Sequence, residues 1–317
     1  MKIIAVEPIG ITPIIADKMK AEYAKLGLDF ILYPDRNENK NILIDRMRDA
    51  DIVIISNIKI DEEILSNCKK LKMIAVAFTG VDHIDIEYCK KHNINVCNAS
   101  GYATTAVSEL TLGLILNVYR KITYLENMTR ASRTRENILG YQLKDKTVGI
   151  IGTGAIGRCT AFMLQKLSCN IIAYSRSKHP DIIKANIPYV SLEEIMKQSD
   201  IISLHLPLNK ETYHLITKEL LNLCNPNAII INTARGNVID IQALAEALKN
   251  NTIAGAGIDV FEIEPPLPKT HPLLNAPNCV VVPHIGYATN EAFEHRIKII
   301  NDNILNWIKG TPINKII

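Results

Sequence analysis

The sequence predicts an α/β protein built on two doubly wound parallel sheets. Short β-branched strands alternate with amphipathic helices from residue 3 onward, a pattern typical of parallel strands whose connecting helices cover both faces of a sheet. The chain has 317 residues and is 47% hydrophobic, which is enough for two domain cores. One strand, Thr147–Ile151, runs directly into a glycine-rich turn and a helix.

The first unit is expected to use residues 1–100. Apolar runs of strand length alternate there with helical patterns, and the last run is short. The expected strands are Ile3–Val6, Phe30–Tyr33, Asp51–Ile55, Met73–Ala77 and Asn95–Cys97, and the expected helices are Ile14–Leu26, Ile42–Met47, Glu62–Asn67 and Ile86–Lys91. The amphipathic stretch Asn290–Ile308 should cross back and pack on this unit, so residues 288–317 are assigned to it.

The second unit is expected to use residues 101–287. It begins with a long helix, Ala103–Tyr119, that is apolar over much of its surface and should be buried on several sides, with another subunit as one candidate partner. The polar stretch Arg130–Gly140 leads to the first strand. The remaining strands are predicted at Asn170–Tyr174, Ile201–Leu206, Ala228–Asn232, Ala254–Asp259 and Val280–Val282.

The turn after Thr147–Ile151 reads G-x-G-x-x-G, with glycines at 152, 154 and 157. Between a strand and a helix, the first glycine turns the chain, the second lets backbone approach a pyrophosphate, and the third lets the helix pack on the strand. The pyrophosphate would bind the unpaired N–H groups at the start of the helix. The motif therefore predicts a dinucleotide site formed by Gly152, Gly154, Ala155, Ile156 and Gly157, and a plain structural turn is the alternative.

The residues after the next strand indicate whether the dinucleotide is NAD(H) or NADP(H). An acid that accepts a hydrogen bond from the ribose 2′-hydroxyl of NAD is usual there, but this chain has Ser175, Arg176, Ser177 and Lys178. A hydroxyl with Arg and Lys can bind a 2′-phosphate through charge-assisted hydrogen bonds. We therefore predict NADP(H), with NAD(H) as the alternative if these cations are only solvated loop charges.

Polar residues follow three later strands at the edge where open parallel sheets bind ligands. They are Arg235, Glu264 and His284. Singly, each could be a surface or structural residue, but together beside a nicotinamide they suit hydride transfer to a 2-oxo acid. The fork of Arg235 fits a carboxylate and an adjacent carbonyl, and His284 can exchange a proton with the substrate oxygen. Glu264, if hydrogen-bonded to the imidazole, would favour its protonated form.

Composition excludes several other classes. The net charge is +3, from 36 basic and 33 acidic residues that are interspersed along the chain, so no basic stripe indicates nucleic acid or a membrane surface. No apolar run reaches transmembrane length and no signal peptide is evident, which predicts a cytoplasmic protein. Seven dispersed cysteines without C-x-x-C spacing argue against a disulfide framework and predict no metal site.

The chain resembles the D-isomer-specific 2-hydroxyacid dehydrogenases over essentially its whole length. Six motifs in this order carry the resemblance: Ala77–Asp85, Gly152–Gly157, His205–Thr212, Ile231–Gly236, Gly257–Pro265 and Pro283–Gly286. The resemblance implies two Rossmann-like domains with the active-site cleft between them, and a homodimer formed through the region near the long helix.

The resemblance also implies roles for single residues. Arg235, Glu264 and His284 would be the catalytic set, and the backbone N–H groups of Gly80 and Val81, with Arg235, would bind the substrate. Asp259 would meet the nicotinamide amide. The other positions implied to line the cofactor site are Pro207, Thr212, Thr233, Ala234 and Gly286.

Within this family the stretch Asn95–Thr104 looks most like the glycerate dehydrogenases and hydroxypyruvate or glyoxylate reductases, so the expected reaction is reduction of hydroxypyruvate or glyoxylate. The alternatives are a D-lactate-type or D-3-phosphoglycerate dehydrogenase, or a cofactor-sensing binding protein of the same fold. Two departures bear on this choice. Ser175 replaces the usual acid, and the tryptophan that many members carry before the glycine motif is missing, because Trp307 is the only one in the chain.

Overall fold

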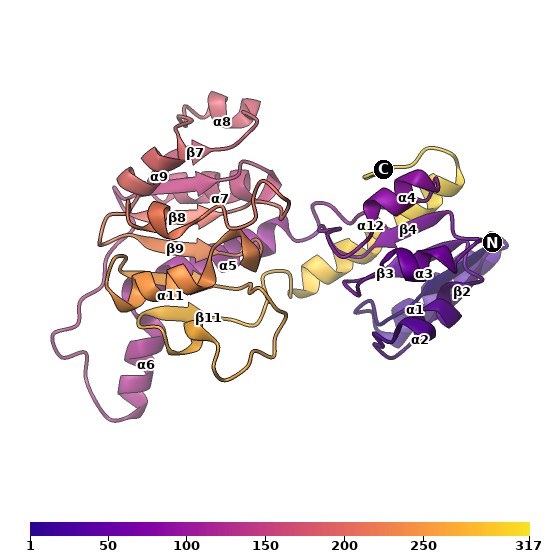
Figure 1. The fold of residues 1–317 in the computed structure, drawn as a ribbon, viewed down its shortest axis with the longest axis horizontal. Coiled ribbons are helices and arrows are strands. Elements are labelled where there is room, and N and C mark those ends of the chain that lie inside the picture. Colours follow the sequence, from indigo (N-terminus) through magenta and orange to yellow (C-terminus); the bar gives the residue numbers. More distant parts are fainter. The chain divides into compact units, whose positions relative to one another are not determined.

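The computed structural model describes residues 1–317 and divides them into two compact units. One comprises Met1–Ala103 and Ala288–Ile317, and the other comprises Thr104–Tyr287 (Figure 1). Each unit is built on one sheet, and all strand pairs in both sheets are parallel. The predicted fold class is therefore confirmed.

The sheet of the first unit has five strands in the order β2-β1-β3-β4-β5. Its strands are β1 (Lys2–Ala5), β2 (Asp29–Leu32), β3 (Ile52–Ile55), β4 (Met73–Val76) and β5 (Asn95–Cys97), and its helices are α1 (Pro13–Lys25), α2 (Lys40–Met47), α3 (Glu62–Ser66), α4 (Ile86–Lys91) and α12 (Asn290–Ile308). Side chains alternate between two buried faces. α2, α3 and α4 cover one face, whereas α1 and α12, the latter yellow in Figure 1, cover the other.

The sheet of the second unit has six strands in the order β11-β10-β9-β8-β6-β7. The strands are β6 (Thr147–Ile151), β7 (Asn170–Tyr174), β8 (Ile201–Leu204), β9 (Ile229–Asn232), β10 (Gly255–Ile258) and β11 (Cys279–Val281). The helices are α5 (Thr104–Arg120), α6 (Ile122–Arg130), α7 (Ala155–Lys166), α8 (Pro180–Lys184), α9 (Leu192–Gln198), α10 (Lys218–Leu221) and α11 (Ile241–Lys249), with two 3₁₀ turns, η1 (Gly236–Val238) and η2 (Pro272–Asn275).

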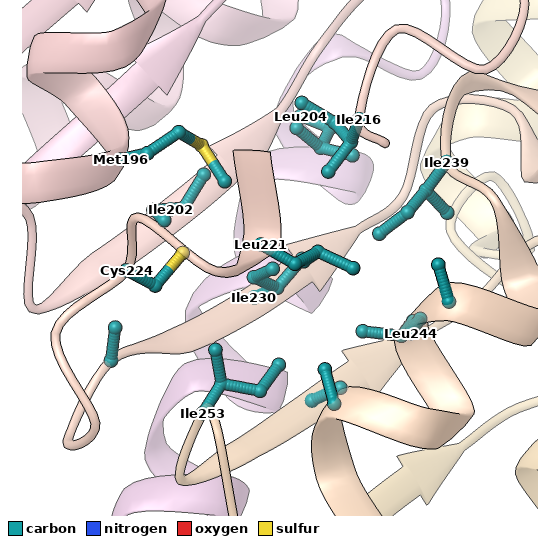
Figure 2. Close-up of a cluster of buried hydrophobic side chains, with 14 of the residues drawn as sticks. Met196, Ile202, Leu204, Ile216, Leu221, Cys224, Ile230, Ile239, Leu244 and Ile253 are labelled. Atoms are coloured by element: carbon teal, nitrogen blue, oxygen red, sulfur yellow. The ribbon is translucent and has the colours of Figure 1, made fainter. Parts of the chain in front are cut away.

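Both faces of this second sheet are also buried, as continuous apolar strands require. Ile229 and Ile231 of β9 pack with α5 and α7, whereas Ile230 faces α9, α10 and α11. Figure 2 shows the latter cluster, in which Ile202, Leu204 and Ile230 of the sheet meet Leu221 and Leu244 of the helices. Two packed faces give the strand ends a rigid base from which the polar loops emerge.

Two local features of the second unit add to the expected elements. α6 was not predicted, and it begins directly after Lys121, whose left-handed backbone (φ +54°) ends α5. Ile122, Leu125 and Met128 recur in it at helical spacing, but only Met128 is buried. The helix expected after the glycine turn begins at Ala155, so Gly157 lies inside its first turn.

None of the helices combines the length and apolarity that a membrane span needs.

Candidate active site

The carboxyl edge of the six-stranded sheet carries nearly all of the predicted site residues. The strand order reverses between β6 and β8, and open parallel sheets bind their ligands beside such a reversal. The glycine turn follows β6 and Ser175 follows β7. Arg235, Glu264 and His284 follow β9, β10 and β11, which are neighbours in the sheet.

The glycine turn fits a pyrophosphate. Gly152 has φ +97°, and a Cβ on it would collide with the carbonyl of His205, while a Cβ on Gly157 would collide with the carbonyl of Gly152. These two glycines are therefore required by packing within the protein. Gly154 is different, because it is the N-cap of α7, no side chain caps that helix, and a Cβ there would meet no protein atom within 4 Å. Its neighbourhood leaves the first N–H groups of α7 open to an anion.

The loop after β7 presents cations next to this turn. Arg176 Nη1 lies 2.6 Å from Glu211 Oε2, and both side chains are largely exposed. Lys178 Nζ lies over the ring of Tyr189, whose hydroxyl donates to Thr153 Oγ1 at 2.9 Å. Tyr189 thus ties the cation loop to the glycine turn. No carboxylate replaces the missing acid at Ser175, although Glu211 reaches Arg176 from the neighbouring loop.

Four further predicted cofactor residues lie in the loops after β8 and β9. Thr212 Oγ1 donates to the carbonyl of Pro207 at 2.6 Å, which closes the loop after β8. Thr233 is buried and its hydroxyl lies 3.0 Å from that of Thr111 on α5. Ala234 donates its backbone N–H to the Asn232 side chain. These bonds show that the loops are internally ordered, and the cofactor contacts of all four residues stay predictions.

His284 and Glu264 form the central pair of the site. Nδ1 of His284 lies 3.0 Å and 3.1 Å from the two carboxylate oxygens of Glu264. A carboxylate only accepts, so Nδ1 must carry the proton of this bond, and Nε2 is left to face a reactant. The ring of Tyr287 stands edge-on to the imidazole at 5.5 Å.

A buried carboxylate sets the backbone that carries His284. Asp259 is 1% exposed, and its two oxygens accept from the N–H groups of Ile285 (2.7 Å) and Gly286 (2.9 Å). The carbonyl of Asp259 accepts from the N–H of His284, which has a left-handed backbone with φ +55°. Burial raises the pKa of Asp259, and the two backbone hydrogen bonds oppose that shift. Asp259 therefore anchors the His284 loop, and its expected contact with the nicotinamide amide stays a prediction.

Arg235 lies between the end of β9 and η1. Its Nη1 donates to the carbonyl of Ala234 at 2.7 Å. The next residue, Gly236, packs so closely on Phe261 that any Cβ would collide with the Phe261 carbonyl. Glycine is thus required here for the Arg235 turn to lie against the segment that leads to Glu264.

Gly80 and Val81 lie in the first unit, in the loop that follows β4. The carbonyl of Val81 accepts from Ile84 N, and the Asn98 side chain donates to Thr79 O at 2.6 Å. The loop is therefore ordered within its own unit. Substrate binding by these backbone groups stays a prediction.

Comparison with known proteins identifies the family. The family model described as "D-isomer specific 2-hydroxyacid dehydrogenase, NAD binding domain" matches residues 112–286. This chain belongs to the D-isomer-specific 2-hydroxyacid dehydrogenases. It is therefore an oxidoreductase that acts on a CH–OH group with a nicotinamide cofactor. The resemblance inferred from the six motifs is confirmed.

Relatives with named activities cover most of the dehydrogenase. A glyoxylate reductase of Thermococcus litoralis is 41% identical over 281 residues, which is 86% of this chain and 84% of that protein. A hydroxypyruvate reductase of Blautia hydrogenotrophica is 33% identical over 279 residues, 86% of each protein. Among solved structures, an acyclic imino acid reductase in complex with NADPH and D-Arg matches with a TM-score of 0.91 and 32% identity over 100% of both chains.

Three residues that support the site of the dehydrogenase were not predicted from its sequence. Tyr189, Glu211 and His271 each contact a site loop through a side chain. Tyr189 forms an isolated β-bridge with Ala173, and no local pattern marks it. Glu211 lies in the polar loop of the His205–Thr212 motif, in which no role was assigned to it. His271 precedes a proline, a context as common for ordinary loops as for functional ones.

Proposed function

We propose that the dehydrogenase reduces a short 2-oxo acid, glyoxylate or hydroxypyruvate, with NADPH. The hydrogen-bonded pair of His284 and Glu264 at the carboxyl edge of the second sheet carries this proposal. The names of the relatives from Thermococcus litoralis and Blautia hydrogenotrophica support the choice of substrate. We assign cofactor binding to the second unit and substrate-carboxylate recognition to the backbone of Gly80 and Val81 in the first.

The proposed mechanism divides the work between cofactor and side chains. A bound nicotinamide supplies the hydride that reduces the carbonyl carbon. Arg235 neutralises the substrate carboxylate and polarises the carbonyl oxygen with its planar fork. His284 donates the Nε2 proton to that oxygen, and Glu264, bound to Nδ1, stabilises the protonated ring before the transfer. In the oxidation of the hydroxy acid the same nitrogen takes the proton back.

We propose NADP(H) over NAD(H) because of the cations after β7. Ser175, Arg176, Ser177 and Lys178 would surround the 2′-phosphate, and an exposed guanidinium binds phosphate in a bidentate manner. Arg176 would exchange its bond to Glu211 for one to the phosphate. The structural relative that was solved with NADPH supports this choice. Exchange of Ser175 for Asp should move the preference of the enzyme toward NADH.

We further propose a homodimer in the cytoplasm. Four large apolar side chains of α6 and the loop that follows it are about half exposed or more, namely Ile122, Tyr124, Leu139 and Tyr141. Exposed apolar side chains of this size would suit a surface that another subunit covers. All seven cysteines are free thiols, which suits a reducing compartment.

The test is a panel of 2-oxo acids assayed with NADPH and with NADH. Glyoxylate and hydroxypyruvate should give the highest kcat/KM, and NADPH should be preferred. Higher efficiency with pyruvate or phenylpyruvate would favour a D-lactate-type enzyme instead. Cofactor binding without turnover of any acid would favour the cofactor-sensing alternative and overturn the proposal.

A further inference from the structure

A buried histidine lies behind the site without touching any residue of the proposed catalytic set. His271 is 3% exposed and sits at the start of η2, between β10 and β11. Its Nδ1 accepts from the N–H of Leu273 at 3.3 Å, and its Nε2 lies 3.2 Å from the carboxylate of Glu262. Because Nδ1 is the acceptor, Nε2 must be the protonated nitrogen that donates to Glu262. Both ring nitrogens of a neutral imidazole are thus satisfied.

His271 is fixed to the core of the second unit. Leu273, two residues later, is 1% exposed and belongs to the cluster that includes Leu244 and Ile258. The backbone N–H of His271 donates to Pro268, and its carbonyl accepts from Leu274. The imidazole therefore projects from a rigid base. Whatever it binds is positioned relative to the sheet.

The segment that contacts His271, Phe261–Glu262, lies between the Arg235 turn and Glu264. Phe261 packs edge-on against the His271 ring at 5.4 Å, and Glu262 is its hydrogen-bond partner. On one side the backbone of Phe261 and Glu262 lies against Gly236, next to Arg235. On the other side the chain continues through Ile263 to Glu264, which binds His284.

We propose that His271 and Glu262 form a clamp that positions Arg235 and Glu264 for hydride transfer. The clamp holds one short segment, Phe261–Glu262, and that segment determines both where the Arg235 turn packs and where Glu264 meets His284. His271 is a positioning residue, since it acts through Glu262. This inference rests on the proposed catalytic roles of Arg235 and Glu264.

Two substitutions at His271 separate its two hydrogen bonds. His271→Asn keeps an acceptor close to the backbone, so η2 retains its N-cap, but it loses the donor to Glu262. His271→Gln places an amide N–H near the position of Nε2 and loses the cap instead. The clamp predicts that His271→Asn lowers kcat by about tenfold to a hundredfold, the effect of a small misplacement of reacting groups, and leaves the Kd for NADPH unchanged. His271→Gln should retain most of kcat although it loses the cap.

Glu262→Ala provides the matched control on the other side of the bond. It should lower kcat as His271→Asn does, and the double variant should be no worse than either single one, because both remove the same interaction. A wild-type kcat in His271→Asn, or equal losses in the Asn and Gln variants, would overturn the clamp. Either result would leave the substrate and cofactor assignment intact.

Hydrogen exchange of residues 260–264 tests the clamp without turnover. Protection of these amides should fall in His271→Asn and in Glu262→Ala and persist in His271→Gln. Equal protection in all three variants would overturn the proposal. If the wild-type enzyme reduced no 2-oxo acid, the proposed function would fail, while this measurement would still decide whether the clamp exists.

Discussion

The two sheets reverse their strand order in the same way, but different groups lie at the two reversal points. In the first unit the reversal lies between β1 and β3, where Glu7 is 1% exposed and accepts from the N–H of Ser56 at 2.8 Å and from Arg36 at 2.7 Å. In the second unit it lies between β6 and β8, where Gly154 opens α7 and no side chain caps the helix.

The difference shows how one topology can serve two purposes. Backbone N–H groups at a reversal point attract an anion. The first unit fills the point with its own carboxyl group, that of Glu7, which accepts the hydrogen bonds available there. The second unit has glycine at the corresponding turn, which leaves the donors for a phosphate. The predictions below test this contrast, from the largest expected effect to the smallest.

Removal of the His284 imidazole from the edge of the second sheet should lower activity strongly but leave the fold intact. His284→Ala should lower kcat by about 10²–10⁴-fold, the usual contribution of a general acid. Steady-state kinetics and a thermal melt measure the two effects separately. An unchanged kcat would show that His284 is not the general acid, and the second sheet would then lose its proposed catalytic role.

Arg235→Lys should mainly weaken substrate binding at the same edge. Lysine keeps the charge but not the planar fork, so KM for the 2-oxo acid should rise by about tenfold to a hundredfold, as expected for the loss of a charged hydrogen bond. The measurement is KM at saturating cofactor. A KM equal to that of the wild type would show that the fork does not bind the carboxylate.

Two glycines in one turn should respond differently to alanine. Gly157→Ala places a Cβ against the carbonyl of Gly152, so it should reduce the free energy of unfolding by about 1–3 kcal/mol, as overpacking does. Gly154→Ala meets no protein atom and should leave stability unchanged while it weakens cofactor binding. Urea unfolding and fluorescence titration with NADPH distinguish the two. Unimpaired binding in Gly154→Ala would show that the pyrophosphate does not approach this backbone.

The smallest effect is expected at the other reversal point. Burial raises the pKa of Glu7 above its usual 4.5, against the opposing hydrogen bond from Ser56. The folded state therefore binds more protons than the unfolded state, and this contribution to stability is lost as pH rises from 4.5 through the raised pKa. Relative to Glu7→Gln, the wild type should lose stability over that window, by an amount small against a total of about 5–15 kcal/mol. Urea unfolding at several pH values should give diverging curves, and parallel curves would contradict the prediction.

Local sequence was sufficient for most of the fold. β3 (Ile-Val-Ile-Ile) is a continuous apolar run, and β9 is one up to its last residue, Asn232; such runs indicate strands buried on both faces. α6 was not predicted, although Ile122, Leu125 and Met128 recur in it at helical spacing, and most of its residues face solvent. Its start depends on the left-handed backbone of Lys121, for which lysine has no local preference.

The sequence by itself determined the order of strands and helices, the glycine turn and the family, because each rests on residues that are close together in the chain or on motifs in a characteristic order. The tertiary structure alone revealed the contacts across loops that no motif indicated, which are those of Tyr189 with Thr153 and of His271 with Glu262. Such contacts depend on the order in which strands pair and on the backbone path of each loop. The local hydrophobic pattern determines neither the strand pairing nor the loop paths, because it shows that a side chain is buried but not which residue it contacts.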